Sequence, residues 1–281
     1  MSNQKSYHNN KPTLYIVATP IGNILELSYR SIEVLNSVEY IACEDTRRTR
    51  KLTTHYNIKT KLISYHNYNE DIISDKIIKL LDKNINIALV SDGGYPTISD
   101  PGYILITQCI NKEYNIVTIS GSNACLTALI GSGLPIYPYI FYGFLPKSLT
   151  KAETVLIELE KQPYTLVLYE TPHRIDKIIK LLYKVFNNRK CCICRELTKI
   201  HEEYIRDDLK NLSNITLDLK GEIVIVIEGY KQQQIDISTQ QINKEINQLL
   251  KSNNKLNDII KKLAKKYNKK KNEIYNNYHK C

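Results

Sequence analysis

The stretch ALVSDGGYPTISDPGYILI, residues 88–106, decides the fold of this chain. Its apolar start at 88–90 is typical of a buried strand, and the apolar residues Tyr103, Ile104 and Ile106 are typical of a helix. The loop between them holds three glycines and two prolines, so it carries few bulky side chains. In an α/β sheet, ligands bind outside the carboxyl ends of the strands, and glycine lets them approach the backbone. The stretch therefore predicts a ligand-binding strand, loop and helix.

The same alternation of strand and helix extends in both directions from this stretch. We expect strands at 13–19, 39–45, 61–66, 85–91 and 114–120, with helices at 27–38, 71–81 and 121–133. A second series has strands at 139–146, 164–171, 190–197 and 221–229, a helix at 173–186 and a short segment of uncertain type at 202–209. This order predicts an α/β protein with two domains, residues 12–132 and 133–232, and a mostly parallel sheet. Gly and Pro cluster where the two domains join, at 131–138.

The carboxyl-terminal part of the chain is strongly basic. We expect a linker at 231–238 and a small basic helical module at 239–281. Residues 251–281 hold ten lysines against Asp258 and Glu273, so most of the net charge of +10 lies there. A basic end on a near-neutral body favours a polyanion, most simply nucleic acid, as partner. Alternatively, the lysines only increase solubility or reflect the general richness of the chain in Lys, Asn and Ile. The apolar spacing of residues 255–278 is compatible with a helix-turn-helix-like module or with a basic amphipathic tail.

Several functional classes lack their signatures in this sequence. No apolar run approaches the roughly 18 to 20 residues of a membrane span, and the polar start lacks a signal core, so we expect a cytoplasmic protein. Seven scattered cysteines are typical of reduced thiols. Cys191 and Cys194 have metal-like spacing without a second half-site, so we predict a buried strand there and no metal. No P-loop, dinucleotide fingerprint or G-x-S-x-G elbow is present.

Six motifs that occur in order over residues 12–230 carry a family resemblance. They are LYIVATPIGN (14–23), CEDTRRTRKL (43–52), SDGGYP (91–96), ETPHR (170–174), CRELTKIHEEYIR (194–206) and KGEIVIVIEG (220–229). Together they resemble the tetrapyrrole methylase-like superfamily, or class III methyltransferases. The first two are typical of its ribosomal branch, which methylates the 2′-oxygen of a cytidine in 16S rRNA.

The resemblance implies a homodimer and S-adenosylmethionine held in the cleft between the two domains. Matched motif by motif, it implies cofactor contacts at Pro20, Gly93, Gly94, Tyr95, Ile98, Asn123, Ala124 and Glu170. The chain departs from the family pattern at two places. Tyr95 stands where the family has threonine, and Ser120 and Ser122 stand where it has prolines. These changes predict weaker cofactor binding, while the persisting glycines keep the backbone contacts.

Methyl transfer to a ribose hydroxyl favours a nearby group that accepts the proton. Asp45 and Glu44 follow the second strand and match the acidic position tied to catalysis in the superfamily, and Asp45 is preferred. The alternative is that either acid caps the next helix or pairs with Arg47. His66 and His201 are rival bases, although a purely structural role is the more common one for a histidine.

A cluster of cations beside the same motif predicts RNA contact. Arginine forms bidentate hydrogen bonds with phosphate, so we expect Arg47, Arg48 and Arg50, with Lys51, to bind substrate. His66 is added to this substrate-binding set. A solvated helix face is the alternative.

The leading interpretation is therefore an enzyme that uses S-adenosylmethionine to methylate a cytidine 2′-oxygen in the 16S rRNA of the small ribosomal subunit. Methylation of a tetrapyrrole is an alternative that leaves the arginines and the lysine-rich end unexplained. A third interpretation is an RNA-binding protein that no longer methylates, favoured only by Tyr95, Ser120 and Ser122.

Overall fold

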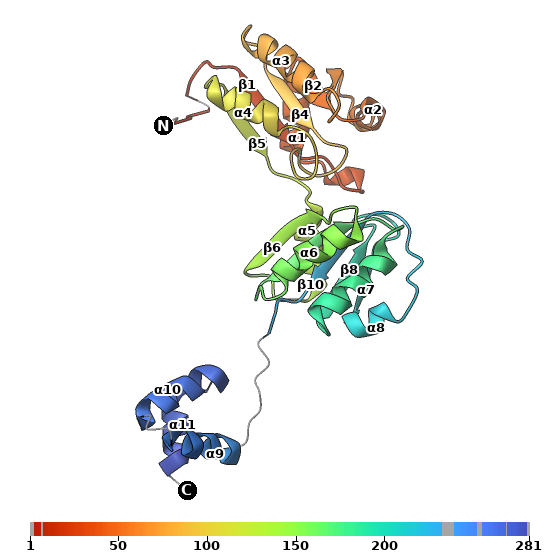
Figure 1. Ribbon diagram of the computed structural model, residues 1–281. Coiled ribbons are helices and arrows are strands. Elements are labelled where there is room, and N and C mark those ends of the chain that lie inside the picture. Colours follow the sequence, from red (N-terminus) through yellow and green to blue (C-terminus); the bar gives the residue numbers. More distant parts are fainter. Residues whose placement is uncertain (1–2, 7, 232–238, 252–254, 268, 280–281) are drawn as a thin grey trace. The chain divides into compact units, whose positions relative to one another are not determined.

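The computed structural model describes residues 3–6, 8–231, 239–251, 255–267 and 269–279 (Figure 1). By packing, the chain divides into two units, residues 1–230 and 231–281. The predicted linker at 231–238 lies outside the described residues except for Lys231.

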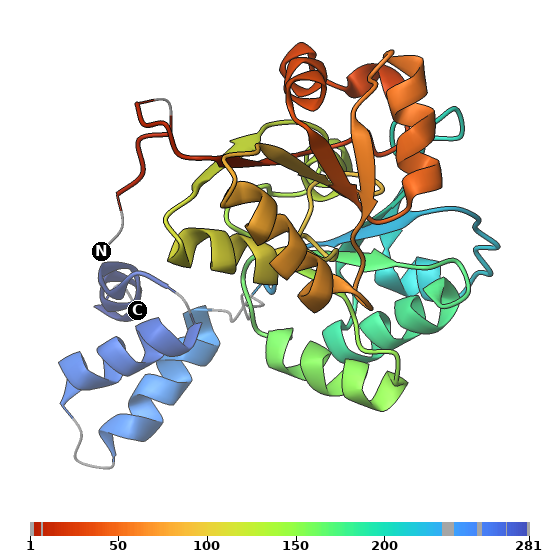
Figure 2. The same ribbon diagram turned by 90° about the horizontal axis from the view of Figure 1, so that it is seen from above.

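The first half of the larger unit is built on a five-stranded parallel sheet, in the order β3-β2-β4-β1-β5. The strands are β1 (Thr13–Val17), β2 (Tyr40–Cys43), β3 (Lys61–Ser64), β4 (Ile87–Val90) and β5 (Asn115–Ile119). The helices are η1 (Ile24–Glu26), α1 (Tyr29–Ser37), α2 (Thr46–His55), α3 (Glu70–Leu81) and α4 (Tyr103–Asn111). The α1–α2 segment packs on one face of the sheet and α3 with α4 on the other (Figure 2). The parallel sheet predicted for this half is confirmed.

The register of this sheet gathers its loops at one edge. Val17 at the end of β1 pairs with Val90 of β4 and with Ile119 of β5, and Cys43 of β2 also pairs with Val90. Four strands thus end at the same level. The loops that follow them therefore emerge together at the carboxyl edge, where α/β sheets bind their ligands.

The second half is built on a mixed sheet, in the order β6-β7-β10-β8-β9. Its elements are β6 (Tyr139–Phe144), α6 (Leu149–Leu159), β7 (Thr165–Glu170), α7 (Ile175–Phe186), β8 (Lys190–Arg195), β9 (Glu203–Asp208), α8 (Leu209–Ser213) and β10 (Ile223–Ile227). Of the four pairs of neighbouring strands, β6–β7 is parallel and the other three are antiparallel, so the parallel pattern of the first half does not continue. The short connection between β8 and β9 brings the chain straight back, which only an antiparallel pair allows. Helix α6 was not predicted, and the uncertain segment at 202–209 forms β9.

Helix α5 (Ala124–Ser132) connects the two halves and packs on the second sheet. Cys125, Ala128 and Leu129 lie in one core cluster with Val167 of β7 and Val224 of β10, while α6, α7 and α8 cover the opposite face. The domain ranges 12–132 and 133–232 remain a proposal. This packing favours a boundary just before α5.

The cysteines of β8 lie inside this second half. Cys191, Cys192 and Cys194 are buried and free. The prediction of a buried strand at this place is confirmed.

The smaller unit contains α9 (Thr239–Leu250), α10 (Leu256–Tyr267) and α11 (Lys271–His279). These helices bury a core of their own, which includes Ile246, Ile259, Leu263 and Ile274. The lysines of α10 and α11 lie mostly on the exposed faces. Within the described part of the chain, no helix has the length and apolar character needed to cross a membrane.

Candidate active site

A cavity of about 720 Å³ lies where the carboxyl-end loops of the first sheet meet the second half. Small-molecule sites commonly have volumes of about 300–1,000 Å³. The first half contributes residues within 19–24, 48–52, 91–100 and 123–124, and the second contributes Phe144 and residues within 169–172, 197–199 and 221–224. The cavity is therefore built by both α/β halves.

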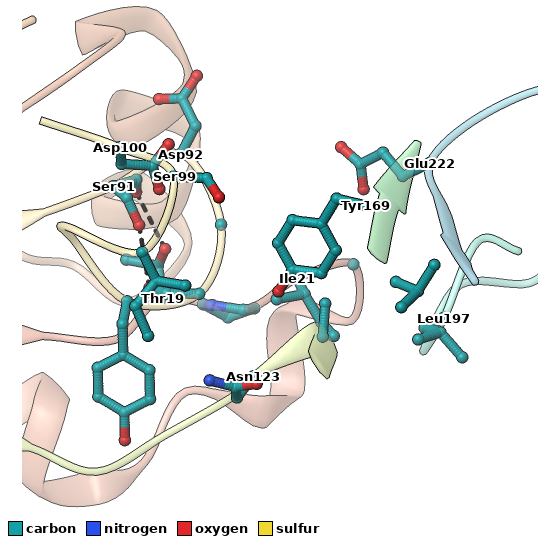
Figure 3. A pocket seen from close by; sticks show the side chains of 18 of the residues that line it. Thr19, Ile21, Ser91, Asp92, Ser99, Asp100, Asn123, Tyr169, Leu197 and Glu222 are labelled. Atoms are coloured by element: carbon teal, nitrogen blue, oxygen red, sulfur yellow. Dashed lines mark hydrogen bonds between the residues drawn. The ribbon is translucent and has the colours of Figure 1, made fainter. Parts of the chain in front are cut away.

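The loop that follows β4 is hydrogen-bonded to the loop that follows β1. The backbone N–H groups of Thr19 and Gly94 donate to each other's carbonyl oxygens, both at 2.9 Å. The Ser91 hydroxyl donates to the Gly94 carbonyl at 3.0 Å, and the Thr19 hydroxyl donates to the Ser91 carbonyl at 3.0 Å (Figure 3). Gly94 has φ +83, a backbone conformation that residues other than glycine rarely adopt. The backbone in this wall of the cavity is thus fixed before any ligand arrives.

Backbone strain is concentrated in the same loop. Thr97 and Ser99 have φ values of 73 and 70, which are costly for residues with a Cβ atom. Gly102 has φ +136, and a Cβ there would lie 2.9 Å from the side chains of Leu89 and Thr97. Such strain is typical of functional sites, where the surrounding structure holds it in place.

Tyr95, one of the departures from the family pattern, links two walls of the cavity. Its hydroxyl accepts a hydrogen bond from the Gly121 N–H at 2.9 Å. Gly121 precedes Ser122, whose hydroxyl donates to Glu26 Oε2 at 3.2 Å. The tyrosine and the serine that replace a threonine and a proline therefore make hydrogen bonds that hold the loop between β5 and α5.

Glu170 places a buried carboxylate in the second wall of the cavity. Its side chain has no exposed surface. Oε1 accepts hydrogen bonds from the Thr171 N–H and lies 3.6 Å from Arg174 Nε. Oε2 is buried and has no hydrogen-bond partner among the described residues. Because buried polar atoms are normally satisfied, this oxygen fits a ligand that carries N–H or O–H donors, as S-adenosylmethionine does.

Two acids that the sequence analysis did not select, Asp92 and Asp100, line the opposite side of the cavity. Figure 3 shows them across from Tyr169 and Glu222. Burial raises the pKa of Asp100 to about 7, and repulsion from Glu44 and Asp92 acts in the same direction. A carboxyl group with this pKa accepts and releases protons near neutral pH. Both acids stand in the loop after β4, each directly after a serine. This position at the carboxyl edge of the sheet is the sequence feature that could have identified them as site residues.

Asp45 and Glu44 stand beside the cavity but are not among the residues that line it. Asp45 is the N-cap of α2: its Oδ1 accepts the Arg47 N–H at 2.8 Å, and its Oδ2 accepts from the Arg47 guanidinium at 2.7 Å. These hydrogen bonds hold the pKa of Asp45 well below its usual range. Both alternatives weighed from the sequence, the cap and the Arg47 pair, are thus present. The pKa of Glu44 is raised by burial and then by Asp92.

The predicted substrate-binding residues are distributed around helix α2. Arg48 lines the cavity together with Lys51, and its Nε lies 3.5 Å from Asp92 Oδ2. Arg47 and Arg50 are exposed outside the cavity.

The histidines lie elsewhere. His66 does not line the cavity, and its Nδ1 is buried without a hydrogen-bond partner in the part of the chain that the structure describes. His201 is exposed on a turn after β8. Neither rival base is therefore in the cavity wall.

All eight residues predicted to bind the cofactor line this cavity: Pro20, Gly93, Gly94, Tyr95, Ile98, Asn123, Ala124 and Glu170. They come from four segments that are far apart in the sequence: the loops after β1 and β4, the start of α5 and the end of β7. Their roles toward a cofactor stay predictions, but a single ligand can reach all of them.

The comparisons with known proteins agree with this architecture. Residues 13–213 match the model of the family described as Tetrapyrrole (Corrin/Porphyrin) Methylases. Curated relatives from several bacteria bear the name Ribosomal RNA small subunit methyltransferase I. The chain is 42% identical over 233 residues to that of Halalkalibacterium halodurans, which covers 82% of this chain and 81% of the relative. It is 40% identical to that of Bacillus subtilis (79% and 77% covered) and to that of Vibrio cholerae (87% and 85% covered).

Solved structures share the fold at low sequence identity. The methyltransferase CobJ superposes with a TM-score of 0.61 at 14% identity, covering 80% of this chain and 97% of CobJ. Uroporphyrin-III-C-methyltransferase from Thermus thermophilus has a TM-score of 0.57 at 16% identity, covering 78% of this chain and 94% of that structure. These likenesses concern the fold alone. The family match and the 40–42% identities establish that this chain belongs to the tetrapyrrole (corrin/porphyrin) methylase family and is a relative of the ribosomal RNA small subunit methyltransferase I proteins.

Proposed function

We propose that this protein uses S-adenosylmethionine to methylate the 2′-oxygen of a cytidine in the 16S rRNA of the small ribosomal subunit. The observation that carries the proposal is one cavity, lined by all eight predicted cofactor residues, with cationic helix α2 at its rim. The names of relatives at 40–42% identity supply the substrate class. The proposal includes a homodimer and action in the cytoplasm.

The residues present fit the cofactor at three points. The backbone around Gly93 and Gly94 lets a ligand lie against the main chain, since a Cβ on Gly93 would have only Pro20 O and Ile21 Cα as near neighbours, at 3.5 and 3.7 Å. Glu170 Oε2 is available for donor groups. Phe144 and Tyr169, with ring centroids 5.5 Å apart, offer aromatic surface to a cation or a base. When bound, S-adenosylmethionine supplies a methyl group activated by a sulfonium.

The chain's own residues then orient the ribose and accept its proton. Arg48 and Lys51 line the cavity beside the acids and are placed to hold a phosphate of the substrate strand. Asp100, ionised, accepts the proton of the attacking 2′-hydroxyl. Burial, followed by repulsion from Glu44 and Asp92, raises the pKa of Asp100 to about 7, so it exchanges protons near neutral pH. Asp45 holds the first turn of α2 and thereby positions Arg48.

Two other functions are less well supported. Methylation of a tetrapyrrole is compatible with the fold but gives no role to the cations of α2. A protein that binds RNA without methylating would follow from loss of the cofactor site. The hydrogen bond from Gly121 to Tyr95 instead gives the main departure from the family pattern a structural role in that site.

Calorimetric titration with S-adenosylmethionine tests the proposal first. We expect micromolar binding by the full chain and its loss in Gly94→Trp, because Gly94 has a positive φ and forms the cavity wall. Gly133→Ala is the matched control, since Gly133 also has a positive φ (+77) but has nothing within 4 Å of an added Cβ. Tritium transfer to unmodified small-subunit particles, followed by mapping of the modified nucleoside, then identifies the product. No binding with or without particles would contradict the proposal.

A further inference from the structure

A second hollow lies on the first half of the protein, at the free edge of its sheet. It has a volume of about 470 Å³ and is lined by β3 and the two residues before it, by Tyr40 of β2, by Arg50 of α2 and by residues of α3. Strand β3 is an edge strand of this sheet and, among the described residues, pairs only with β2. This basic edge groove, as we call it, is not part of the cavity described above, and none of its lining residues is shared with that cavity.

The groove has an unbalanced charge. Its lining contains four cations, Arg50, Lys59, Lys61 and Lys76, and no aspartate or glutamate. All four are exposed, and among the described residues none of them forms an ion pair with a carboxylate. Lys61 also makes a ring contact: its Nζ lies 6.0 Å from the centroid of Tyr40. Cations gathered in a hollow without counter-charges attract polyanions.

Helix α2 connects this groove with the cavity. Arg48 and Lys51, three residues apart, lie on the same helix face and line the cavity, whereas Arg50 lines the groove. A strand that enters the cavity at Arg48 therefore needs only to cross one helix to reach Arg50 and the three lysines. Lysines suit this task because phosphate contacts fix the path of a strand without reading its sequence.

We infer that the basic edge groove binds the phosphate backbone of the RNA that flanks the methylated nucleotide. The inference rests on the proposed function, which supplies RNA as the substrate. The competing explanation is that the lysines only protect an open sheet edge from pairing with another strand. That role requires charge at the edge but no affinity for RNA, so the two explanations predict different binding data.

The test uses the full-length triple variant Lys59→Gln/Lys61→Gln/Lys76→Gln. Its matched control is Lys151→Gln/Lys177→Gln/Lys180→Gln, which removes the same charge from exposed positions on α6 and α7. Affinity for unmodified small-subunit particles is measured between 50 and 300 mM salt, with KM and kcat for methyl transfer and the calorimetric affinity for S-adenosylmethionine. Thermal unfolding of each variant establishes that it is folded.

We expect the groove variant to bind particles at least about 10-fold more weakly near 150 mM salt, with a slope of log K against log salt shallower by about 2. KM should rise while kcat and cofactor affinity stay within about twofold, and the control should resemble the wild type. Equal affinities and slopes for the groove variant and the control would overturn the inference. Protection of the open sheet edge would then be the explanation for the lysines. If the wild type binds particles but transfers no methyl group, the proposed function fails, whereas loss of that binding in the groove variant still supports the groove.

Discussion

The hydroxyl of Tyr95 accepts a hydrogen bond from the backbone N–H of Gly121 at 2.9 Å. Tyr95 belongs to the loop after β4, and Gly121 belongs to the loop after β5, so one side chain fixes the distance between two walls of the cavity. A threonine at this position is too short to make the same contact. The family's prolines stiffen the second loop, and here the tyrosine and the serine hydrogen bonds hold it.

Removal of this hydroxyl should loosen the cofactor site. We expect Tyr95→Phe to cost about 1 kcal/mol, because the Gly121 N–H loses its partner, and to raise the Kd for S-adenosylmethionine about fivefold. Calorimetry measures the Kd, and Tyr103→Phe is the control because Tyr103 is 75% exposed on α4. An unchanged Kd in Tyr95→Phe would mean that the loop keeps its position without the hydrogen bond.

Glu170 should contribute directly to cofactor affinity. Because its buried Oε2 has no hydrogen-bond partner in the described part of the chain, a donor of the ligand gains a hydrogen bond to a charged group, which is worth about 1.5–3 kcal/mol. Glu170→Gln should therefore weaken S-adenosylmethionine binding by about 10- to 100-fold. Glu153→Gln, which breaks the Lys184 ion pair on the surface, should leave the affinity unchanged. Urea unfolding of both variants separates this effect from loss of the Arg174 contact, and an affinity near the wild-type value in Glu170→Gln would refute the role.

The rate of methyl transfer should depend on the ionisation of Asp100. An acid with a pKa of about 7 accepts a proton only when it is ionised, so kcat/KM should rise with pH and reach half its maximum near pH 7. Asp100→Asn should lower kcat at least about 100-fold and abolish this pH dependence. Single-turnover rates between pH 5.5 and 9 measure both effects.

Asp45→Asn serves as the comparison for Asp100. Asparagine is also a good N-cap, so this variant should retain helix α2 and at least half of the activity. A loss in Asp45→Asn as large as that in Asp100→Asn would restore Asp45, the preference from the sequence, as the residue that accepts the proton.

Asp100 should also make the stability of the fold depend on pH. Its pKa is raised on folding, so between about pH 4 and 7 the unfolded chain has released a proton that the folded protein retains. The free energy of unfolding therefore falls as the pH rises through this window, and Glu44, whose pKa is also raised, acts in the same direction. Asp100→Asn should be more stable than the wild type at pH 8, by about 1 kcal/mol after allowance for solvent screening, and not at pH 4. Urea unfolding at both pH values measures this, and equal stabilities at pH 8 would contradict it.

Much of the architecture could be predicted from local sequence. The run at 87–90 is apolar at every position because β4 is buried on both faces, and two of the glycines after it, Gly94 and Gly102, have the positive φ that a tight loop requires. These preferences, an apolar run for a buried strand and glycine for a positive φ, depend on residue type and can be seen in the sequence alone. They led to the parallel first sheet, to the loop at its carboxyl edge and, through the motifs, to the eight residues of the cavity wall.

The mixed second sheet could not be predicted in the same way. The sequence of a buried strand such as β10 does not encode the direction of its neighbours, because both faces are apolar in either case. Helix α5 follows directly from β5, yet its packing on the second sheet depends on side chains of β7, β8 and β10.

The sequence by itself determined the class of fold, the loops that form the site and the family, because these depend on residue type and spacing along the chain. Only the tertiary structure decided which acid has a pKa near neutrality. Asp45 is held as an anion by Arg47, two residues away, while Asp100 is half-buried near Asp92 of its own loop and near Glu44, which comes from the loop after β2. It also decided that Arg50 joins Lys76 in a groove instead of Arg48 in the cavity. The physical reason is the same in both cases: burial and charge act through space, and the chain brings distant residues together only when it folds.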